Sequence, residues 1–226
     1  MMRSPRTKII ACQTVGEELK PLLPSNFEMT LLDYGLHNVP ENLHLQLQAA
    51  IDETSQDVDV ILFGYGLCAN ALIGLNSRKF KLVFPKVDDC IALFLGSREE
   101  YLRQFKKAPG TFYLTKGWIE CGDDPYTEYC DMREKYGPDK ALRITKQYIC
   151  NYTRLALINV GTNNSEAYRK YAKMVADHFD LTFEEIPGSN ALLKKMLQGK
   201  WDEDFVIVPP GEEVQYSSFN FLGNTK

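Results

Sequence analysis

The sequence lacks the short motifs by which many metal and nucleotide sites are recognised. None of its six cysteines forms a Cys-x-x-Cys pair, so the zinc-ribbon and thioredoxin-like signatures are absent. The glycine-rich string Gly64-Tyr65-Gly66 lacks the third glycine of a dinucleotide-binding fingerprint, and no Gly-Lys-Ser/Thr follows it. Any metal site in this chain must therefore be built from cysteines that lie far apart in the sequence.

The sequence also lacks a basic excess and a long apolar run. Lysine and arginine total 26 against 30 aspartates and glutamates, and the net charge of −4 argues against a nucleic-acid partner, since phosphate binding needs a basic face. No apolar run approaches the roughly 18 residues of a membrane-spanning helix, and the first apolar stretch, 9–12, is too short for the core of a signal peptide. We expect a cytoplasmic protein without membrane contact, in which disulfides are not expected.

The pattern of apolar residues predicts an α/β fold. Hydrophobic residues make up 44% of the chain and charged residues 25%, which is typical of a folded globular protein. In the first part, short apolar runs alternate with segments of helical spacing, and this order is typical of a Rossmann-like sheet. The expected strands are 7–12, 28–34, 58–63 and 81–84, and the expected helices are 15–23, 40–54 and 90–96.

Three parts are predicted along the chain. Residues 1–96 form a Rossmann-like lobe that carries a cysteine site, and residues 97–152 form a connecting segment that is helical and aromatic, with an extended run at 111–119. Residues 153–226 repeat the α/β rhythm and are expected to form a second, smaller lobe. We expect mainly parallel sheets in both lobes and a small-molecule site in the cleft between them.

Three cysteines follow three of the predicted strands. Cys12 closes the first strand, Cys68 lies four residues after Gly64, and Cys90 lies five residues after Pro85. The carboxyl ends of parallel strands meet at one edge of a sheet, so these thiols are expected to converge. Three soft thiolates select zinc, Cu(I) or an iron–sulfur cluster and leave one coordination position open. We predict a three-cysteine metal site; the alternative is three unrelated buried cysteines.

The fourth ligand of this site stays undecided between an open position, Cys121 and His37. Cys121 stands next to a glycine in a predicted loop, and His37 lies in the loop after the second strand. A histidine there is either a ligand, an acid–base group or an ordinary surface residue. Cys130 and Cys150 fall in helical stretches and are expected to be structural.

Three side chains near the predicted strand ends are candidates for proton transfer: His37, Tyr65 and Asp88. Asp88 and Asp89 directly precede Cys90, where they form either an acid–base pair or the N-cap of the following helix. An N-cap role alone is enough to explain the presence of one of these two carboxylates.

Backbone groups are the candidates for binding a cofactor. Gly64 and Gly66 permit close approach of the backbone to a bound group, and Asp89 stands at the start of a helix. Gly161 and Thr162 open a later helix and either bind an anion or simply form a turn and cap.

Several strings resemble those of a known family. They are GYGLC at 64–68, DCI at 89–91 with LGS at 95–97, and GTFY at 110–113 with GW at 117–118. Together they resemble a family of proteins of unknown function that is frequent in methanogens and anaerobic bacteria. Its genes often lie near those of corrinoid-dependent methyltransferases. The resemblance covers roughly residues 8–211, and GYGLC is its most specific string.

The resemblance implies an anaerobic setting and a cysteine-ligated site, and it supplies no established reaction. Our functional hypothesis adds a link to anaerobic one-carbon or sulfur metabolism. Members of the family often carry histidine before the Asp-Cys pair, where this chain has Asp88, and this departure puts a histidine role there in doubt. The arrangement is also similar to that of small desulfidases and quinolinate synthase, in which single cysteines from Rossmann-like lobes hold a [4Fe-4S] cluster with one open iron. Likeness of arrangement does not fix function.

Two functions follow as hypotheses. In the first, a [4Fe-4S] cluster on the three cysteines acts as Lewis acid or sulfur acceptor on a small molecule, as in an iron–sulfur lyase or desulfidase. A zinc–thiolate site for methyl transfer is the nearest variant. In the second, the protein is not catalytic and binds or delivers a corrinoid, a metal or a methyltransferase partner.

Overall fold

The computed structural model describes residues 5–161 and 165–219, and this part of the chain forms two compact units. The first unit contains the residues up to Arg98 together with those from Asn190 onward, and the second contains Glu99–Ser189. Each unit has a β-sheet with helices packed on it, which confirms the predicted α/β class with mainly parallel, Rossmann-like sheets.

The sheet of the first unit has, among the described residues, five strands in the order β2-β1-β3-β4-β8. Neighbouring strands from β2 to β4 are parallel, and β8 is antiparallel to β4. The strands are β1 (Thr7–Cys12), β2 (Glu28–Leu32), β3 (Val60–Gly64), β4 (Lys81–Pro85) and β8 (Phe205–Val208). β1, β3 and β4 are almost entirely buried, as expected for parallel strands that are covered on both faces.

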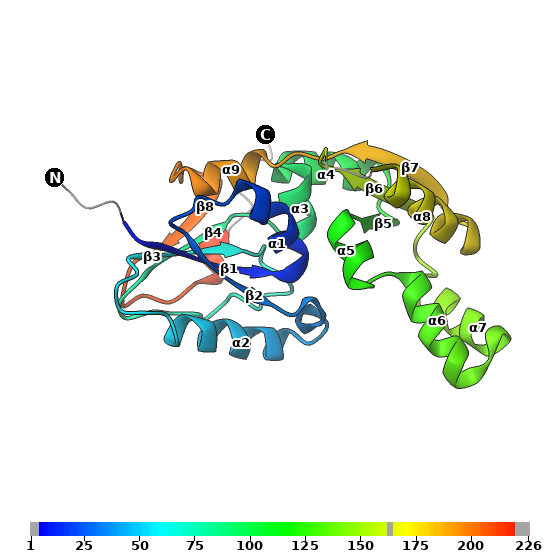
Figure 1. Ribbon diagram of the computed structural model, residues 1–226, viewed down its shortest axis with the longest axis horizontal. Coiled ribbons are helices and arrows are strands. Elements are labelled where there is room, and N and C mark those ends of the chain that lie inside the picture. Colours follow the sequence, from blue (N-terminus) through cyan, green and yellow to red (C-terminus); the bar gives the residue numbers. More distant parts are fainter. Residues whose placement is uncertain (1–4, 162–164, 220–226) are drawn as a thin grey trace. The chain divides into compact units, whose positions relative to one another are not determined.

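Helices cover both faces of this sheet, with α2 on one face and α1 and α3 on the other (Figure 1). α2 starts with a proline at its first position and buries Leu43, Leu47 and Ile51, which recur at helical spacing. The first unit contains α1 (Gln13–Leu19), α2 (Pro40–Asp52), α3 (Cys90–Leu95), α9 (Ala191–Leu197) and the 3₁₀ turns η1 (Lys20–Leu22), η2 (Tyr34–Asn38) and η3 (Tyr216–Phe219).

The described part of the second unit holds a three-stranded parallel sheet in the order β5-β6-β7. Its elements are β5 (Thr111–Leu114), β6 (Arg154–Asn159), β7 (Thr182–Pro187), α4 (Arg98–Lys107), α5 (Lys116–Cys121), α6 (Pro125–Tyr136), α7 (Pro138–Tyr148) and α8 (Ser165–His178). The core lies between the sheet and these helices and includes Leu155, Leu157, Val175 and Phe179.

The division into units differs from the predicted boundaries at 96 and 152. The predicted connecting segment, 97–152, supplies β5 and four helices to the second unit, and the predicted second lobe, 153–226, is split. Residues from Asn190 onward return to the first unit because β8 pairs with β4, in the register Val83 to Ile207. The apolar pattern of a four-residue strand does not specify which strand it pairs with. The pairing of β8 with β4 was therefore not predicted from the sequence.

The predicted extended run at 111–119 is only partly a strand. β5 ends at Leu114, and α5 begins at Lys116. The Thr115 side chain accepts a hydrogen bond from the Trp118 backbone at 3.5 Å, and Gly122 ends the helix in a left-handed conformation. Cys121 is therefore the last residue of a helix and not part of a loop.

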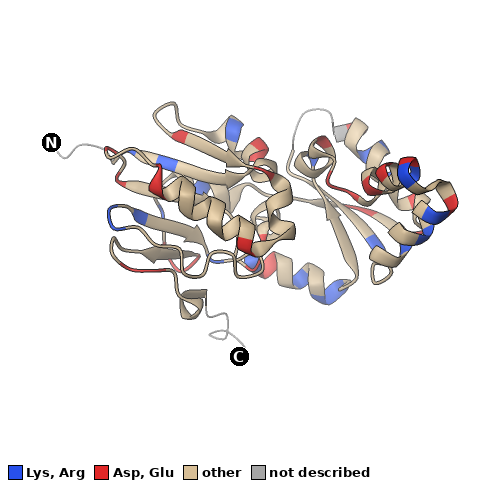
Figure 2. Cartoon of the chain, turned by 90° about the horizontal axis from the view of Figure 1, so that it is seen from below, with Lys and Arg blue, Asp and Glu red and all other residues tan. Residues whose placement is uncertain are grey.

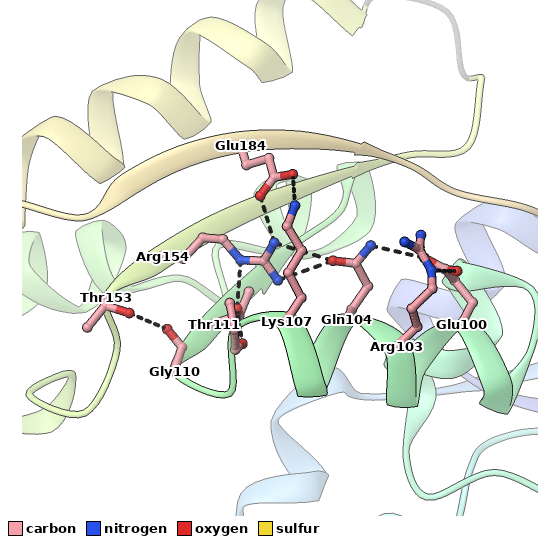
Figure 3. A network of polar contacts seen from close by, with 10 residues as sticks. Glu100, Arg103, Gln104, Lys107, Gly110, Thr111, Thr153, Arg154 and Glu184 are labelled. Atoms are coloured by element: carbon pink, nitrogen blue, oxygen red, sulfur yellow. Dashed lines mark hydrogen bonds and ion pairs between the residues drawn. The ribbon is translucent and has the colours of Figure 1, made fainter.

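A buried arginine joins α4 to the sheet of the second unit (Figure 3). The Arg154 side chain is 6% exposed and donates hydrogen bonds to Thr111 Oγ1 at 2.8 Å and to Glu184 Oε2 at 2.7 Å. It also donates to Gln104 Oε1 on α4, and Lys107 of the same helix pairs with Glu184 at 2.6 Å. This network compensates a buried charge, which is otherwise costly.

Charged residues of both signs are interspersed along both units (Figure 2). Among the described residues, none of the helices has the length and apolar content needed to cross a membrane.

Candidate functional site

Cys12, Cys68 and Cys90, here called the thiol site, follow three strands that are adjacent in one sheet. Cys12 is the last residue of β1, Cys68 lies in the loop after β3, and Cys90 is the first residue of α3 after β4. β1, β3 and β4 are neighbouring parallel strands, so their carboxyl ends lie at the same edge. The strand interpretation on which the predicted convergence depends is thus confirmed.

Backbone hydrogen bonds hold the loops after β3 and β4 together. The Leu67 N–H donates to the Val87 carbonyl at 2.9 Å, and the Cys68 N–H donates to the Asp88 carbonyl at 3.1 Å. Gly66 lies against the backbone of Asp89, and a Cβ atom at position 66 would be 2.6 Å from both the Cα and the carbonyl carbon of that residue. Only glycine permits this approach, which fixes the spacing of the two loops.

The turn that carries Cys68 has a strained backbone. Cys68, Ala69 and Asn70 have φ values of 46°, 54° and 69°, so three successive residues with side chains adopt the left-handed conformation. Each such residue costs about 1 kcal/mol or more. The Ala71 N–H closes the turn on the Cys68 carbonyl at 3.2 Å. Strain of this kind is concentrated at functional sites, because there the surroundings must hold a side chain in an unfavourable conformation.

The three thiols act on one another electrostatically. Burial is the main cause that raises the pKa of Cys68, to about 12, and the negative charges of Asp89 and Cys12 raise it further. The pKa of Cys90 is also raised, first by burial and then by Cys68, Asp89 and Cys12. Two backbone N–H groups, those of Gly66 and Cys90, favour the Cys68 thiolate. Without a bound cation, the thiols of Cys68 and Cys90 are therefore protonated at neutral pH.

These pKa shifts predict slow alkylation of the metal-free protein. At pH 8 a thiol with a pKa of about 12 is ionised about 10³-fold less than an ordinary thiol with a pKa of about 8.5. We expect iodoacetamide to modify Cys68 at least about 100-fold more slowly than Cys150, which is exposed. Peptide mass spectrometry over a time course measures both rates in one sample. Equal rates for the two cysteines would contradict the assigned environment.

Tyr65 lies with the thiol site and is the best placed of the predicted proton-transfer residues. The residue is 3% exposed, and its hydroxyl oxygen has no hydrogen-bond partner among the described residues. Burial raises its pKa, and the charges of Cys12, Cys68, Cys90 and Asp33 raise it further. A buried polar group without a partner is rare in a native protein and calls for an explanation.

The other two proton-transfer candidates have partners elsewhere. Asp88 forms an ion pair with Arg98, at 2.7 Å between Oδ2 and Nε. His37 is exposed, and its Nδ1 contacts the Tyr34 carbonyl in its own 3₁₀ turn. Asp89 is the N-cap of α3 and accepts a hydrogen bond from the Ile91 N–H at 2.9 Å. The pair Asp88 and Asp89 thus divides into an ion pair and a cap.

The predicted backbone sites have packing explanations. A Cβ atom on Gly64 would lie 2.6 Å from the Cβ atom of Ala11, so this glycine permits close packing of β3 on β1. Gly161, in the second unit, has a φ of 82° and donates its N–H to the Asn159 side chain at 2.9 Å. Thr162 lies outside the described residues.

The remaining cysteines lie in the second unit. Cys121 ends α5 and is partly exposed, Cys130 packs against the hydrophobic core, and Cys150 is exposed. The packing of Cys130 agrees with the structural role expected for it.

Two residues near the thiol site were not found from the sequence. Thr14 Oγ1 lies 3.2 Å from Cys12 Sγ in a buried contact. Asp33 follows β2, whose Leu32 pairs with Cys12 in the sheet, and Asp33 acts on Tyr65. The sequence analysis placed Asp33 inside the strand 28–34, whereas β2 ends at Leu32, so Asp33 lies just past the strand end.

A family model described as "Protein of unknown function (DUF1638)" matches residues 31–197. This chain belongs to the DUF1638 family. The matched region includes Tyr65, Cys68 and Cys90 of the thiol site, and Cys12 lies before it. No curated protein and no solved structure matches the chain.

The DUF1638 chain has no preformed site for a single metal ion within residues 5–161 and 165–219. No group of three or more His, Cys, Asp or Glu side chains in this part of the protein has the geometry to hold one. A tetrahedral zinc ion with Zn–S bonds of about 2.3 Å needs sulfur atoms about 3.8 Å apart. The thiol site brings its cysteines to one sheet edge but does not form such a constellation.

Proposed function

We propose that Cys12, Cys68 and Cys90 bind a [4Fe-4S] cluster with one open coordination position, at which the protein binds or converts a small molecule. The observation that carries the proposal is the convergence of three soft ligands, from three adjacent strand ends, on the sheet edge where the buried Tyr65 hydroxyl has no hydrogen-bond partner among the described residues. The proposal includes a role in anaerobic one-carbon or sulfur metabolism.

A cluster accommodates three cysteines that form no single-ion constellation among the described residues. Around one ion, all thiolates must lie within one tetrahedron. In a four-iron cluster each thiolate binds a different iron, so the sulfur ligands lie further apart. The thiols of Cys12, Cys68 and Cys90 all raise the pKa of Tyr65, as expected for cysteines that share one sheet edge.

The residues at the edge have separate roles in this proposal. The cysteines hold the cluster, and Gly66 and the cap residue Asp89 keep the loops of Cys68 and Cys90 at a fixed spacing. When bound, a cluster with an open iron supplies a Lewis-acid position. Tyr65 holds a proton beside that position, whereas His37 and Asp88 are engaged outside it.

The test is anaerobic preparation of the protein, with analysis of iron, acid-labile sulfide and zinc and a visible absorption spectrum. We expect about four iron and four sulfide per chain. Each of Cys12→Ser, Cys68→Ser and Cys90→Ser is expected to lower cluster content by more than tenfold, because loss of even an outer partner costs about 10- to 100-fold in metal affinity.

Matched controls are Cys130→Ser and Cys150→Ser, which change cysteines of the other unit. They should retain the iron and sulfide of the parent protein. A colourless protein that contains one zinc per chain would contradict the cluster and support the zinc–thiolate site instead. Retention of all metal in the three thiol-site variants would refute the site itself.

A further inference from the structure

The hydroxyl of Tyr65 is a donor without an acceptor. The side chain is 3% exposed, and no group of the described residues accepts a hydrogen bond from it. Leaving a buried hydroxyl unpaired costs about 1–3 kcal/mol. The loop of Tyr65 is fixed by the strand before it and by the bond from Leu67 to Val87, so the hydroxyl is held in place rather than turned out to solvent.

We propose that Tyr65 donates a hydrogen bond to a sulfur atom of the group bound at the thiol site, and that this bond sets the stability and reduction potential of that group. The inference rests on the proposed function. Tyr65 directly follows β3, at the sheet edge that carries Cys12, Cys68 and Cys90, and the charges of these cysteines and of Asp33 act on its hydroxyl. An ordinary tyrosine hydroxyl is protonated at neutral pH and is a donor, whereas thiolates and inorganic sulfide are acceptors.

Asp33 does not accept a hydrogen bond from the Tyr65 hydroxyl in the structure. Asp33 is exposed, and its Oδ1 accepts a hydrogen bond from the Gly35 N–H at 2.8 Å as the cap of η2. We therefore assign the acceptor for Tyr65 to the group that occupies the thiol site. This assigns Tyr65 a function before any substrate arrives, namely to position and stabilise the bound group.

The bond has a defined effect on reduction. An added electron makes the sulfur atoms more negative, so a donor stabilises the reduced form more than the oxidised form. Tyr65→Phe removes the donor and keeps the ring that fills the core. We expect a more negative midpoint potential for the variant. A tenfold change in the ratio of the two forms corresponds to about 59 mV for a one-electron couple.

The experiment compares wild type, Tyr65→Phe and Tyr129→Phe after anaerobic reconstitution with iron and sulfide. Tyr129 is also buried, at 8% exposed, but it packs with His178 and Phe179 in the second unit. We expect Tyr65→Phe to retain the full iron content, to release iron to a chelator about tenfold faster, and to shift the potential downward. Tyr129→Phe should leave the release rate and the potential unchanged.

Metal-free protein gives a second readout. There the hydroxyl of Tyr65 has no acceptor, so Tyr65→Phe should raise the melting temperature, and loading should reverse this order. Equal release rates and potentials in loaded wild type and Tyr65→Phe would overturn this inference and leave the cluster proposal intact. Absence of any metal in wild type would overturn both.

Discussion

Replacement of Gly66 by alanine is expected to destabilise the first unit by about 3 kcal/mol and to abolish metal loading. The added Cβ atom would lie 2.6 Å from the Cα and the carbonyl carbon of Asp89, and 2.7 Å from its carbonyl oxygen. These are backbone atoms, so no rotation of a side chain relieves the overlap. Insertion of a methyl group into a packed site costs about 1–3 kcal/mol, and the rigid partner puts this case at the upper end.

The loss of loading follows from the same overlap. The loops after β3 and β4 must move apart, which breaks the bond from the Cys68 N–H to the Asp88 carbonyl and separates Cys68 from Cys90. Urea denaturation and iron content measure the two effects. Gly199→Ala is the control, because Gly199 has a φ of 72° with open space around the missing side chain. It should cost about 1 kcal/mol and retain full loading. A Gly66→Ala protein that loads like wild type would show that the loop spacing does not control the site.

Replacement of Arg154 by leucine is expected to destabilise the second unit by about 3–5 kcal/mol. The arginine is 6% exposed and is the centre of the network in Figure 3. Its loss leaves the buried Gln104 and Thr111 oxygens without their donor and removes one of the two cations at Glu184. Removing one partner of a buried charge network typically costs this much.

Arg103→Leu is the matched control, since Arg103 lies on α4 beside Gln104 but is 64% exposed and pairs only with Glu100 among the contacts of Figure 3. We expect little change in stability from it, because exposed ion pairs contribute little. Hydrogen exchange followed by mass spectrometry locates the effect. Increased exchange in β5, β6 and α4 of Arg154→Leu supports the assigned role, and unchanged exchange there would contradict it.

The convergence of the thiols could be predicted from the sequence because it depends on strand order alone. Near-continuous apolar runs identified β1, β3 and β4 as buried parallel strands, and parallel strands place their carboxyl ends at one edge. The cap at Asp89 was also predictable, since its chemistry is local. These features required no knowledge of contacts between distant segments.

The features that required such knowledge were missed. The left-handed run at Cys68–Asn70 contains no glycine, so no residue type signals it. The ion pair of Asp88 with Arg98 joins positions ten residues apart, and the sequence did not indicate this partner of a predicted acid–base residue. The partner of β8 depends on which sheet edge is free, which the local pattern of Phe205–Val208 does not encode.

The central claim is that Cys12, Cys68 and Cys90 ligate one bound group. Alkylation of the reconstituted protein at alkaline pH, with each cysteine followed by mass spectrometry before and after chelation, tests it most directly. We expect these three thiols to be protected together in the loaded protein and all three to become reactive when the metal is removed, each at the rate that its own environment sets, while Cys130 and Cys150 react alike in both states. Protection of only one or two of the three thiols in the loaded protein, or no difference between the two states, would contradict the shared site.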